Sequence, residues 1–367
     1  MKKILIISNS CWNIFNFRKE LIYELNKKKF QITVCAPYDN YYDRIKNIKI
    51  NYIDVKFSRK SYNIFSNFKL ILFYVKCFYK LKPDIIFMYT IKPNIFGSLA
   101  SLFFLKKKNT YNFITGLGTF FFEKSIYKFL ILLLYKISLH SSSNVIFQNK
   151  YDLEYFINKK ITFPKKSILI SGSGVNIKYF EFSKLKYKKN KELTFLCSSR
   201  LIKDKGIIEY IEVAKLIKSE YTQVNFNLLG SLDRENSSCI DENLLISNYK
   251  YVKHIDFTDD IKKYLVECDC FVLPSYREGT SRSLLEALSI GRPLITTNVP
   301  GCNNIVKNDY NGYLCDKKNI ESLFQVIKKM INTPFEIRKK MSINSRKLAE
   351  NKFDVNIINK QILKIII

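Results

Sequence analysis

Short apolar runs alternate with longer amphipathic stretches along the whole chain. The short runs are typical of strands buried in a parallel sheet, and the longer stretches repeat apolar residues at helical spacing. Helices are predicted, for example, over residues 18–27 and 64–80. Strands are predicted at residues 4–7, 32–36, 52–55, 85–88, 111–114, 145–147, 168–170, 194–197, 225–229, 252–255, 271–274, 294–297 and 312–314. This alternation implies an α/β fold with parallel sheets and right-handed crossovers.

A lysine-rich segment, residues 184–191, lacks apolar periodicity and divides the 367-residue chain into two halves of similar size. Each half is predicted to be a doubly wound, Rossmann-like domain, with the N-terminal domain over residues 1–180 and the C-terminal domain over residues 188–349. Ligands of such folds bind beyond the carboxyl ends of the strands, and a cleft between two domains is a natural site. We therefore expect the two domains to face a cleft.

Targeting, membrane-spanning and metal-binding segments are not expected. The apolar run at the start of the chain is too short for a signal peptide and continues into polar residues 8–10, so it is predicted to be a strand. The longest apolar segment, residues 129–135, falls well short of the ~20 residues that span a bilayer. The nine cysteines have no paired spacing and complete no zinc site, which indicates reduced thiols, a cytoplasmic protein and no metal.

The charge needs an explanation, because 61 basic and 32 acidic residues give a formal net charge of +29. The lysines are scattered and no nucleic-acid module is recognisable, so no nucleic-acid partner is expected. Residues 62–82 and 125–139 interleave Phe, Tyr, Leu and Ile with Lys, as an interfacial helix would. We predict that they bind an anionic membrane surface, peripherally, on the inner face of the cytoplasmic membrane. Core helices with a lysine face, and a lysine-rich composition by itself, are the alternatives.

Two glutamates eight positions apart are the most informative chemical feature. They lie in Pro274-Ser-Tyr-Arg-Glu278-Gly-Thr-Ser-Arg-Ser-Leu-Leu-Glu286. The apolar run before this segment predicts a buried strand, Glu278 falls on a turn, and Ser281 is a plausible N-cap of a following helix. The alternative is one solvated glutamate on a turn and another on an exposed helix face.

A helix N-terminus beside two carboxylates suits a nucleotide sugar. The unpaired N–H groups and the partial positive charge at that end attract phosphate, so we expect the amides of Ser283 and Leu284 to face a diphosphate. Glu286 would accept hydrogen bonds from a ribose, and Glu278 would face the group that the diphosphate carries. Arg200 and Lys205 follow the first strand of the second half, where basic side chains reach a diphosphate, unless they are merely a solvated surface.

The two glutamates resemble the E-x7-E motif of the retaining family 4 glycosyltransferases, which have the GT-B fold. The resemblance continues through residues 287–293, 296–301 and 311–314. It implies two Rossmann-like domains, with a final helix at residues 350–367 that crosses back to the N-terminal domain. It also implies a retaining, metal-independent transfer, because basic side chains and a helix N-terminus replace the cation on the diphosphate. No cofactor is expected beyond the nucleotide sugar.

The resemblance assigns roles to particular residues. The catalytic residues would be Arg200, Lys205 and Glu278. Donor-binding residues would be Gly230, Ile255, Gly279, Thr280, Ser283, Leu284 and Glu286. Ser199 stands where the family usually has glycine.

The acceptor side is assigned to the first half. Arg18, at the head of a helix after a loop that starts at Ser8, resembles the Phe-Arg of polysaccharide and glycolipid transferases, where a lipid diphosphate needs such a partner. An exposed helix arginine is the alternative. The acceptor residues would be Asn9, Arg18, Lys92, Gly116 and Gly118. The last two belong to a Gly-Leu-Gly loop that resembles capsule-type and N-glycan-type transferases, although one G-x-G is commonly a tight turn.

The histidine that many family members carry after the fourth strand is absent from residues 88–94. The resemblance implies a hexosyltransferase that moves a hexose or N-acetylhexosamine from a UDP-sugar to an undecaprenyl-diphosphate-linked saccharide, in the assembly of capsule, lipopolysaccharide or another glycan. A catalytically silent membrane scaffold of the same fold and a basic nucleic-acid-binding protein are the alternatives.

Overall fold

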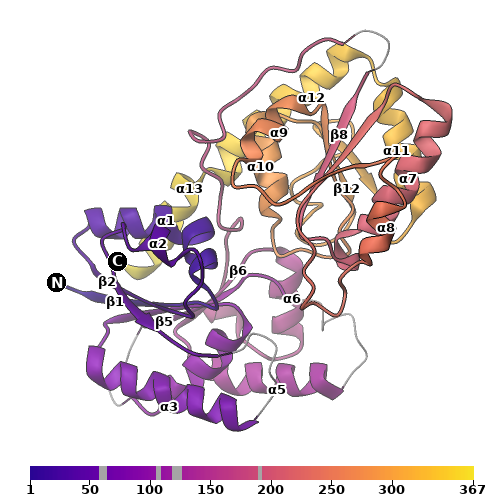
Figure 1. Ribbon diagram of the computed structural model, residues 1–367. Coiled ribbons are helices and arrows are strands. Elements are labelled where there is room, and N and C mark those ends of the chain that lie inside the picture. The colour runs from indigo at the N-terminus through magenta and orange to yellow at the C-terminus, as the bar shows by residue number, and fades with distance from the viewer. Residues whose placement is uncertain (58–63, 105–108, 118–125, 189–191) are drawn as a thin grey trace. The chain divides into compact units, whose positions relative to one another are not determined.

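The computed structural model describes residues 1–57, 64–104, 109–117, 126–188 and 192–367 (Figure 1). The chain divides into two compact units, each with its own parallel sheet. The first unit comprises Met1–Ser173 and Asn356–Ile367, and the second comprises Gly174–Val355. Residues 184–188, the described part of the lysine-rich segment, therefore belong to the second unit.

The first unit is built on a sheet with the order β3-β2-β1-β4-β5-β6-β7. The pairs are parallel, and Ile7 at the end of β1 is level with Cys35 on one side and with Met88 on the other. The strands are β1 (Lys3–Ile7), β2 (Gln31–Ala36), β3 (Asn51–Asp54), β4 (Ile85–Tyr89), β5 (Asn109–Ile114), β6 (Asn144–Phe147) and β7 (Ser167–Leu169).

Helices cover both faces of this sheet. They are α1 (Cys11–Lys27), α2 (Tyr42–Ile45), α3 (Ile64–Leu81), the π-helix η1 (Pro93–Gly97), α4 (Ser98–Leu102), α5 (Ile126–His140), α6 (Lys150–Asn158), the short 3₁₀-helix η3 (Pro164–Lys166) and α13 (Val355–Ile366). Alternate residues of β1 enter different cores, because successive side chains of a strand point to opposite faces. Ile6 packs in a core with residues of α1 and α13, whereas Ile7 packs in a second core with residues of α3 and α5. The final helix thus belongs to the first unit.

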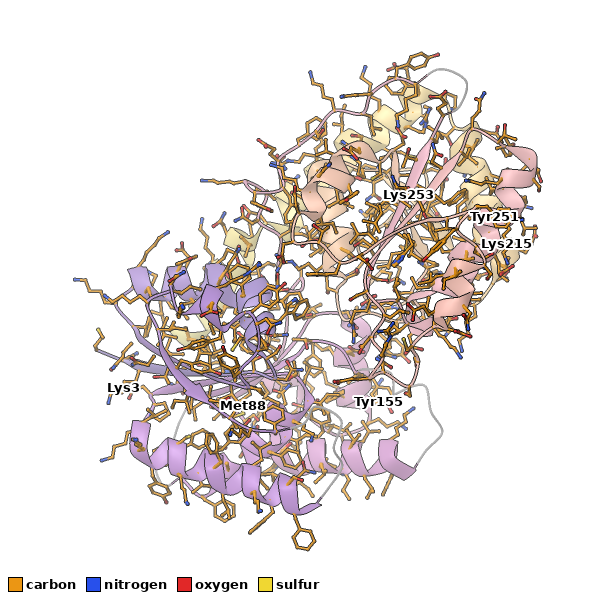
Figure 2. All side chains as sticks on the ribbon, in the orientation of Figure 1. Lys3, Met88, Tyr155, Lys215, Tyr251 and Lys253 are labelled. Atoms are coloured by element: carbon orange, nitrogen blue, oxygen red, sulfur yellow. The ribbon has the colours of Figure 1, made fainter. Side chains whose placement is uncertain are left out.

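The second unit has the sheet order β10-β9-β8-β11-β12-β13, again with parallel pairs. Its strands are β8 (Thr194–Ser198), β9 (Asn225–Leu229), β10 (Lys253–Ile255), β11 (Cys270–Leu273), β12 (Leu294–Thr297) and β13 (Gly312–Cys315). Its helices are the 3₁₀-helix η5 (Lys203–Lys205), α7 (Ile207–Glu220), α8 (Glu242–Ile246), α9 (Ile261–Glu267), α10 (Arg282–Ile290), α11 (Ile320–Asn332), α12 (Phe335–Leu348) and the π-helix η6 (Ala349–Phe353). Side chains fill the space around both sheets (Figure 2).

The doubly wound α/β fold predicted from the sequence is confirmed, and every predicted strand is present with its ends shifted by at most two residues. The prediction for the start of α1 is wrong. The sequence pattern predicts a loop over residues 11–17, but the helix begins at Cys11 because the Ser10 hydroxyl accepts a hydrogen bond from the Asn13 amide at 3.1 Å. Arg18 therefore lies in the middle of α1 and not at its head. Among the described residues, none of the helices is long and apolar enough to cross a membrane.

Candidate active site

The predicted donor residues gather at the carboxyl edge of the second sheet. Arg200 follows β8, Gly230 follows β9, and Glu278 follows β11. Because the strands are parallel, the loops after them meet at one edge. The edge that the fold provides for ligands therefore carries the basic and acidic side chains singled out in the sequence.

Lys205 and Glu278 form an ion pair at the centre of this edge. The Lys205 Nζ lies 2.5 Å from Glu278 Oε1, and the two side chains are only 19% and 12% exposed. The same carboxylate oxygen accepts a hydrogen bond from the Ser275 hydroxyl at 2.7 Å. The pair joins residues 73 positions apart, so the sequence did not show that the two groups would meet.

Two glycines allow the loops to approach closely. Gly206 has φ 72°, and a Cβ there would lie 2.2 Å from the Pro274 carbonyl oxygen. Gly301 has φ 81°, and a Cβ there would lie 2.3 Å from the Glu278 carbonyl oxygen. Only glycine adopts these backbone angles without strain and leaves room for the neighbouring backbone. The two glycines thus fix where Lys205 and Glu278 emerge.

The predicted helix start after Glu278 is confirmed. Helix α10 begins at Arg282, and Ser281 is its N-cap. The Leu284 amide donates to the Ser281 hydroxyl at 3.5 Å, while the Ser283 hydroxyl lies 3.2 Å from the same oxygen. The expected diphosphate contact of the Leu284 amide would therefore replace its bond to the cap. Gly279 and Thr280 form the turn that leads into the helix.

Glu286 is buried, and so it does not lie on an exposed helix face. Only 9% of it is exposed, and its Oε1 accepts from the Arg282 Nε at 2.8 Å. Burial raises the pKa of the Glu286 carboxyl, and the nearby Arg282 guanidinium opposes that rise only in part. A buried carboxylate at the first turns of α10 is well suited to accept hydrogen bonds from a ligand.

Arg200 is exposed and bound to a partner that the sequence analysis missed. Its guanidinium donates to Asp233 Oδ2 at 2.8 Å. Asp233 follows β9, and only the general rule that functional groups follow parallel strands would have indicated it. The neighbouring Gly230 amide donates to the Ile255 carbonyl at 3.0 Å, which joins the loops after β9 and β10.

Tyr276 and Glu209 were also missed. The Tyr276 hydroxyl donates to Glu209 Oε1 at 2.7 Å, and Glu209 is 8% exposed. Burial, together with the hydrogen bond to Glu209, raises the pKa of Tyr276 far above its ordinary value, so the hydroxyl stays a donor at neutral pH. The Tyr276 amide also donates to the Asp204 carbonyl, which ties this loop to the one that carries Lys205.

The predicted acceptor residues belong to the first unit. Asn9 lies between β1 and α1 at the carboxyl edge, and Gly116, with φ 128°, follows β5. Lys92 follows β4 and donates to Asn67 Oδ1 at 3.4 Å, and its partial burial lowers the pKa of the ammonium group. Gly118 lies outside the described residues.

Arg18 is buried, so the structure contradicts only the alternative interpretation of the sequence. It is 3% exposed, and its guanidinium stacks 3.9 Å from the centre of the Tyr89 ring. An exposed helix arginine is therefore excluded. Stacking on an aromatic ring is a typical contact of arginine, and it leaves the guanidinium N–H groups able to donate in the plane of the group.

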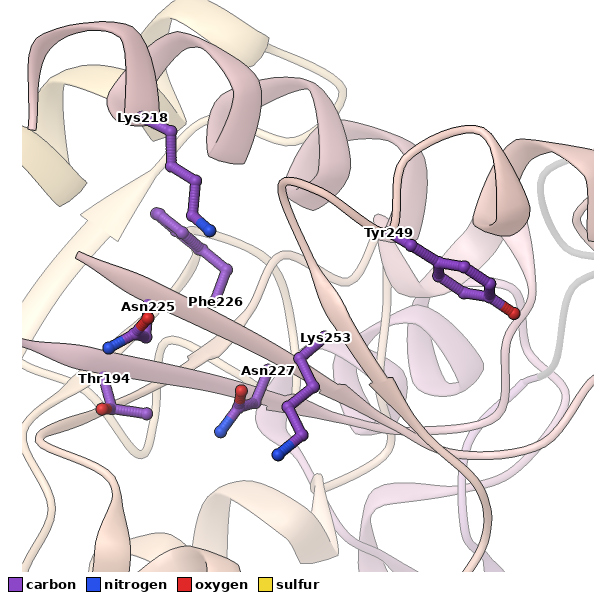
Figure 3. A pocket seen from close by; sticks show the side chains of 7 residues that line it. All are labelled: Thr194, Lys218, Asn225, Phe226, Asn227, Tyr249 and Lys253. Atoms are coloured by element: carbon purple, nitrogen blue, oxygen red, sulfur yellow. The ribbon is translucent and has the colours of Figure 1, made fainter. Parts of the chain in front are cut away.

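A separate pocket of about 310 Å³ lies at the opposite edge of the second sheet (Figure 3). It is lined by Thr194, Lys218, Asn225, Phe226, Asn227, Tyr249 and Lys253. Thr194, Asn225 and Lys253 are the first residues of β8, β9 and β10, so this pocket lies away from the loops that carry Lys205 and Glu278.

Two units with parallel, doubly wound sheets are the architecture of the GT-B class of glycosyltransferases, and the comparisons with known proteins agree. The family model described as glycosyl transferases group 1 matches residues 180–348, and the one described as glycosyl transferase 4-like matches residues 3–149. A Campylobacter jejuni N,N'-diacetylbacillosaminyl-diphospho-undecaprenol alpha-1,3-N-acetylgalactosaminyltransferase is 30% identical over 99% of this chain and 98% of its own. An Escherichia coli UDP-Gal:alpha-D-GlcNAc-diphosphoundecaprenol alpha-1,3-galactosyltransferase is 25% identical over 81% of this chain and 78% of its own.

Solved structures share the fold. The Anabaena protein HepE in complex with UDP and glucose has a TM-score of 0.77 at 17% identity, with 100% of this chain and 99% of that one covered. WaaG, a glycosyltransferase involved in lipopolysaccharide biosynthesis, has a TM-score of 0.73 at 14% identity, with 99% of each chain covered. The chain belongs to the family 4 glycosyltransferases, which have the GT-B fold.

Proposed function

We propose that this protein transfers a hexose or N-acetylhexosamine from a UDP-sugar to a saccharide linked to undecaprenyl diphosphate. The observation that carries the proposal is the Lys205–Glu278 pair at the carboxyl edge of the second sheet, beside the capped start of α10. The two relatives whose names give a diphospho-undecaprenol-linked saccharide support the acceptor class. The assembly of a cell-surface polysaccharide or glycan is the corresponding process.

In this proposal the leaving diphosphate is stabilised by fixed positive charge. Arg200, Lys205 and the N-terminus of α10 would face its oxygens, where charge develops as the bond to the sugar breaks. Glu286 would hold the ribose and Glu278 the sugar. The reaction would retain the anomeric configuration if the acceptor hydroxyl enters on the face that the diphosphate leaves and gives its proton to a phosphate oxygen. It would need no metal, because the fixed positive charge takes the place of a cation.

The ion pairs of Lys205 and Arg200 imply an exchange of partners when a diphosphate binds. Lys205 is held by Glu278, and Arg200 is held by Asp233. A diphosphate would draw both cations to its own oxygens and release the two carboxylates. Glu278 would then be available to accept hydrogen bonds from the hydroxyls of the donor sugar.

The first unit carries a face suited to an anionic membrane. We define the apolar–basic face as the exposed side chains Phe65, Phe68, Lys69, Leu72, Lys76, Tyr79 and Lys80 of α3, Leu102 and Phe103 at the end of α4, and Phe129, Leu130, Leu133, Lys136 and Ile137 of α5. α4 packs against both other helices, and the Tyr79 hydroxyl donates to the Phe103 carbonyl at 2.7 Å.

Charge favours a lipid surface as the partner of this face. Ile64–Leu81 and Ile126–His140 contain no Asp or Glu. Phe65 is 81% exposed and Phe129 is 63% exposed, which is costly in water unless a partner covers them. Lysines around inserted aromatic rings are attracted to anionic headgroups by about 1 kcal/mol each. The protein would therefore work peripherally, on the cytoplasmic leaflet that presents its acceptor.

The direct test is UDP release from a panel of UDP-sugars, with and without a short polyprenyl-diphosphate-linked saccharide. We expect release from one donor only, and only when the acceptor is present. Nuclear magnetic resonance analysis of the product would give the anomeric configuration, methylation analysis would give the linkage position, and chelation by EDTA should leave the rate unchanged. A folded, membrane-bound protein that releases UDP from none of the donors would favour a scaffold in place of an enzyme.

A further inference from the structure

Three hydroxyl groups at the carboxyl edge of the first sheet are buried without a hydrogen-bond partner. They belong to Ser8, directly after β1, to Tyr89, the last residue of β4, and to Thr90, which follows it. Ser8 and Tyr89 are both 0% exposed. Buried hydroxyls without partners are rare in native proteins because desolvation then goes uncompensated.

The hydroxyls of Ser8 and Tyr89 lie on one face of the sheet. β1 and β4 are paired with Ile7 level with Met88, so Ser8 is level with Tyr89. The alternation of side chains places both on the face covered by α1. There the Tyr89 ring is held between the Arg18 guanidinium, at 3.9 Å, and the Phe113 ring, at 4.3 Å.

Thr90 has a strained backbone. Its φ of 71° is in the left-handed region, which β-branched residues rarely adopt. The Asn94 amide donates to its carbonyl at 3.0 Å, where the π-helix η1 begins. Strained residues and single turns of π-helix concentrate at functional sites. The strain and the unpartnered hydroxyls thus occur at the same edge.

The chemistry of these groups fits an oxyanion. Hydroxyl groups donate one hydrogen bond each, and a guanidinium adds charge and further donors. Bonds of this kind to phosphoryl oxygens are short and strong. No sugar is required to satisfy them, since a phosphoryl group supplies the acceptor oxygens that all of them need.

We propose that Ser8, Tyr89 and Thr90, beside Arg18, bind phosphoryl oxygens of the lipid-diphosphate acceptor. The inference rests on the proposed function, and it adds three residues that neither the motifs nor the relatives indicate. The hydroxyl oxygens are shielded from solvent in this structure, so binding must open this edge. A free inorganic diphosphate has the same chemistry and would be held by the same groups.

The experiment compares Ser8→Ala and Tyr89→Phe with the wild type. Tyr89→Phe keeps the ring between Arg18 and Phe113 and removes only the hydroxyl. The matched control is Tyr74→Phe, because Tyr74 of α3 is also 0% exposed and its hydroxyl also lacks a partner. For each protein we would measure the KM for the acceptor, the Kd of UDP, and the thermal shift caused by inorganic diphosphate at saturating UDP.

We expect Ser8→Ala and Tyr89→Phe to raise the acceptor KM about tenfold, to abolish the shift caused by diphosphate, and to leave the Kd of UDP and the melting temperature unchanged or improved. Tyr74→Phe should match the wild type. Unchanged KM and diphosphate shift in both variants would overturn the inference. A raised KM with an intact shift would show a saccharide contact and overturn the phosphoryl assignment. If the wild type transfers no sugar but shows the variant-sensitive shift, the proposed function fails and the oxyanion site stands.

Thr90 gives an independent measurement. Thr90→Gly removes both the hydroxyl and the strain, so it should raise the melting temperature and the acceptor KM together, whereas Thr90→Ser should restore the KM. A stabilised variant with the KM of the wild type would show that the strain has no role in binding.

Discussion

At the scale of single residues, the Lys205–Glu278 ion pair links the stability of the fold to the proposed binding of UDP. Glu278 is 12% exposed, so the loss of Lys205 would leave a nearly buried carboxylate without its cation. We expect Lys205→Met to cost about 2 kcal/mol and to lower the melting temperature by about 5 °C. UDP binding should weaken as well, because a cation that would face the diphosphate is lost. Calorimetric melting and UDP titration measure the two effects.

The double variant Lys205→Met/Glu278→Gln is the control for this prediction. It removes both charges, so it should recover most of the stability while UDP binding and sugar transfer stay lost. A double variant that remains as unstable as Lys205→Met would contradict the assignment of the cost to an unpaired carboxylate.

The buried Glu286 makes stability depend on pH in a specific direction. Its pKa is raised above the ordinary 4.5 in the folded protein, so the folded state holds this proton more tightly than the unfolded chain. Its contribution to stability is therefore present below pH 4.5 and is lost as the pH rises through the raised value. The melting temperature of Glu286→Gln should therefore rise relative to that of the wild type as the pH increases from 4 to 8. The exposed Glu235→Gln serves as the comparison, and an equal gain in both would refute the prediction.

The proposed ribose contact of the same residue is tested by ligand affinity. A hydrogen bond to a charged group is worth about 1.5–3 kcal/mol, so Glu286→Ala should weaken the binding of UDP at least about tenfold. Binding of inorganic diphosphate to the second unit should change far less, because that ligand has no ribose. Isothermal titration with both ligands separates the two contacts, and equal losses would count against the ribose assignment.

At the scale of elements, the loop after β12 positions the loop that carries Glu278. Gly301→Ala would force φ 81° on an alanine and bring its Cβ to 2.3 Å from the Glu278 carbonyl oxygen. We expect a loss of about 2 kcal/mol or more together with weaker UDP binding. Gly97→Ala is the control, since Gly97 has φ −66° and its nearest neighbour would be the flexible Met88 thioether. Melting curves and UDP titration compare them, and similar losses would show that backbone crowding at Gly301 is not the cause.

Two helix starts show how far local sequence determines an element. Ser281 before α10 follows a clear strand and turn, so its capping role was predictable. Ser10 caps α1 in the same way, but the aromatic and Asn residues that follow it obscure the helical period, and the start was missed. Tertiary packing buries that face of α1, which a single-sequence pattern does not register. The strands were predictable because a short apolar run between polar loops is typical of a buried strand.

Contacts distant in the sequence explain what was missed in the site. Asp233 pairs with Arg200 across 33 positions, and Glu209 pairs with Tyr276 across 67 positions. Motifs locate the side chains that are named in a family pattern, but the partners that hold those side chains come from other loops of the sheet. The charge partner of Arg200 therefore needed the parallel topology, which brings the ends of β8 and β9 to one edge.

At the scale of the whole molecule, the net charge of +29 would strengthen binding to an anionic membrane if lysines and exposed aromatic rings lie on the same face. Lys69, Lys76 and Lys80 are exposed on α3 within the apolar–basic face. Lys69→Glu/Lys76→Glu/Lys80→Glu changes the charge by −6, since each replacement turns +1 into −1. At about 1 kcal/mol for each lysine near the surface, affinity for anionic vesicles should fall at least a hundredfold.

The control for the membrane prediction changes the same charge elsewhere. Lys317, Lys340 and Lys347 are exposed on the second unit, and their replacement by Glu gives an equal net charge. Sedimentation with vesicles of phosphatidylglycerol and phosphatidylcholine should show loss of binding for the α3 variant and near-normal binding for the control. If both variants lose binding equally, the affinity for anionic vesicles depends on the total charge of the protein and not on the apolar–basic face. The proposed UDP site lies in the second unit, so the α3 variant should bind UDP as the wild type does. A loss of transfer that is confined to membrane-embedded acceptor would then show that the defect lies in membrane docking.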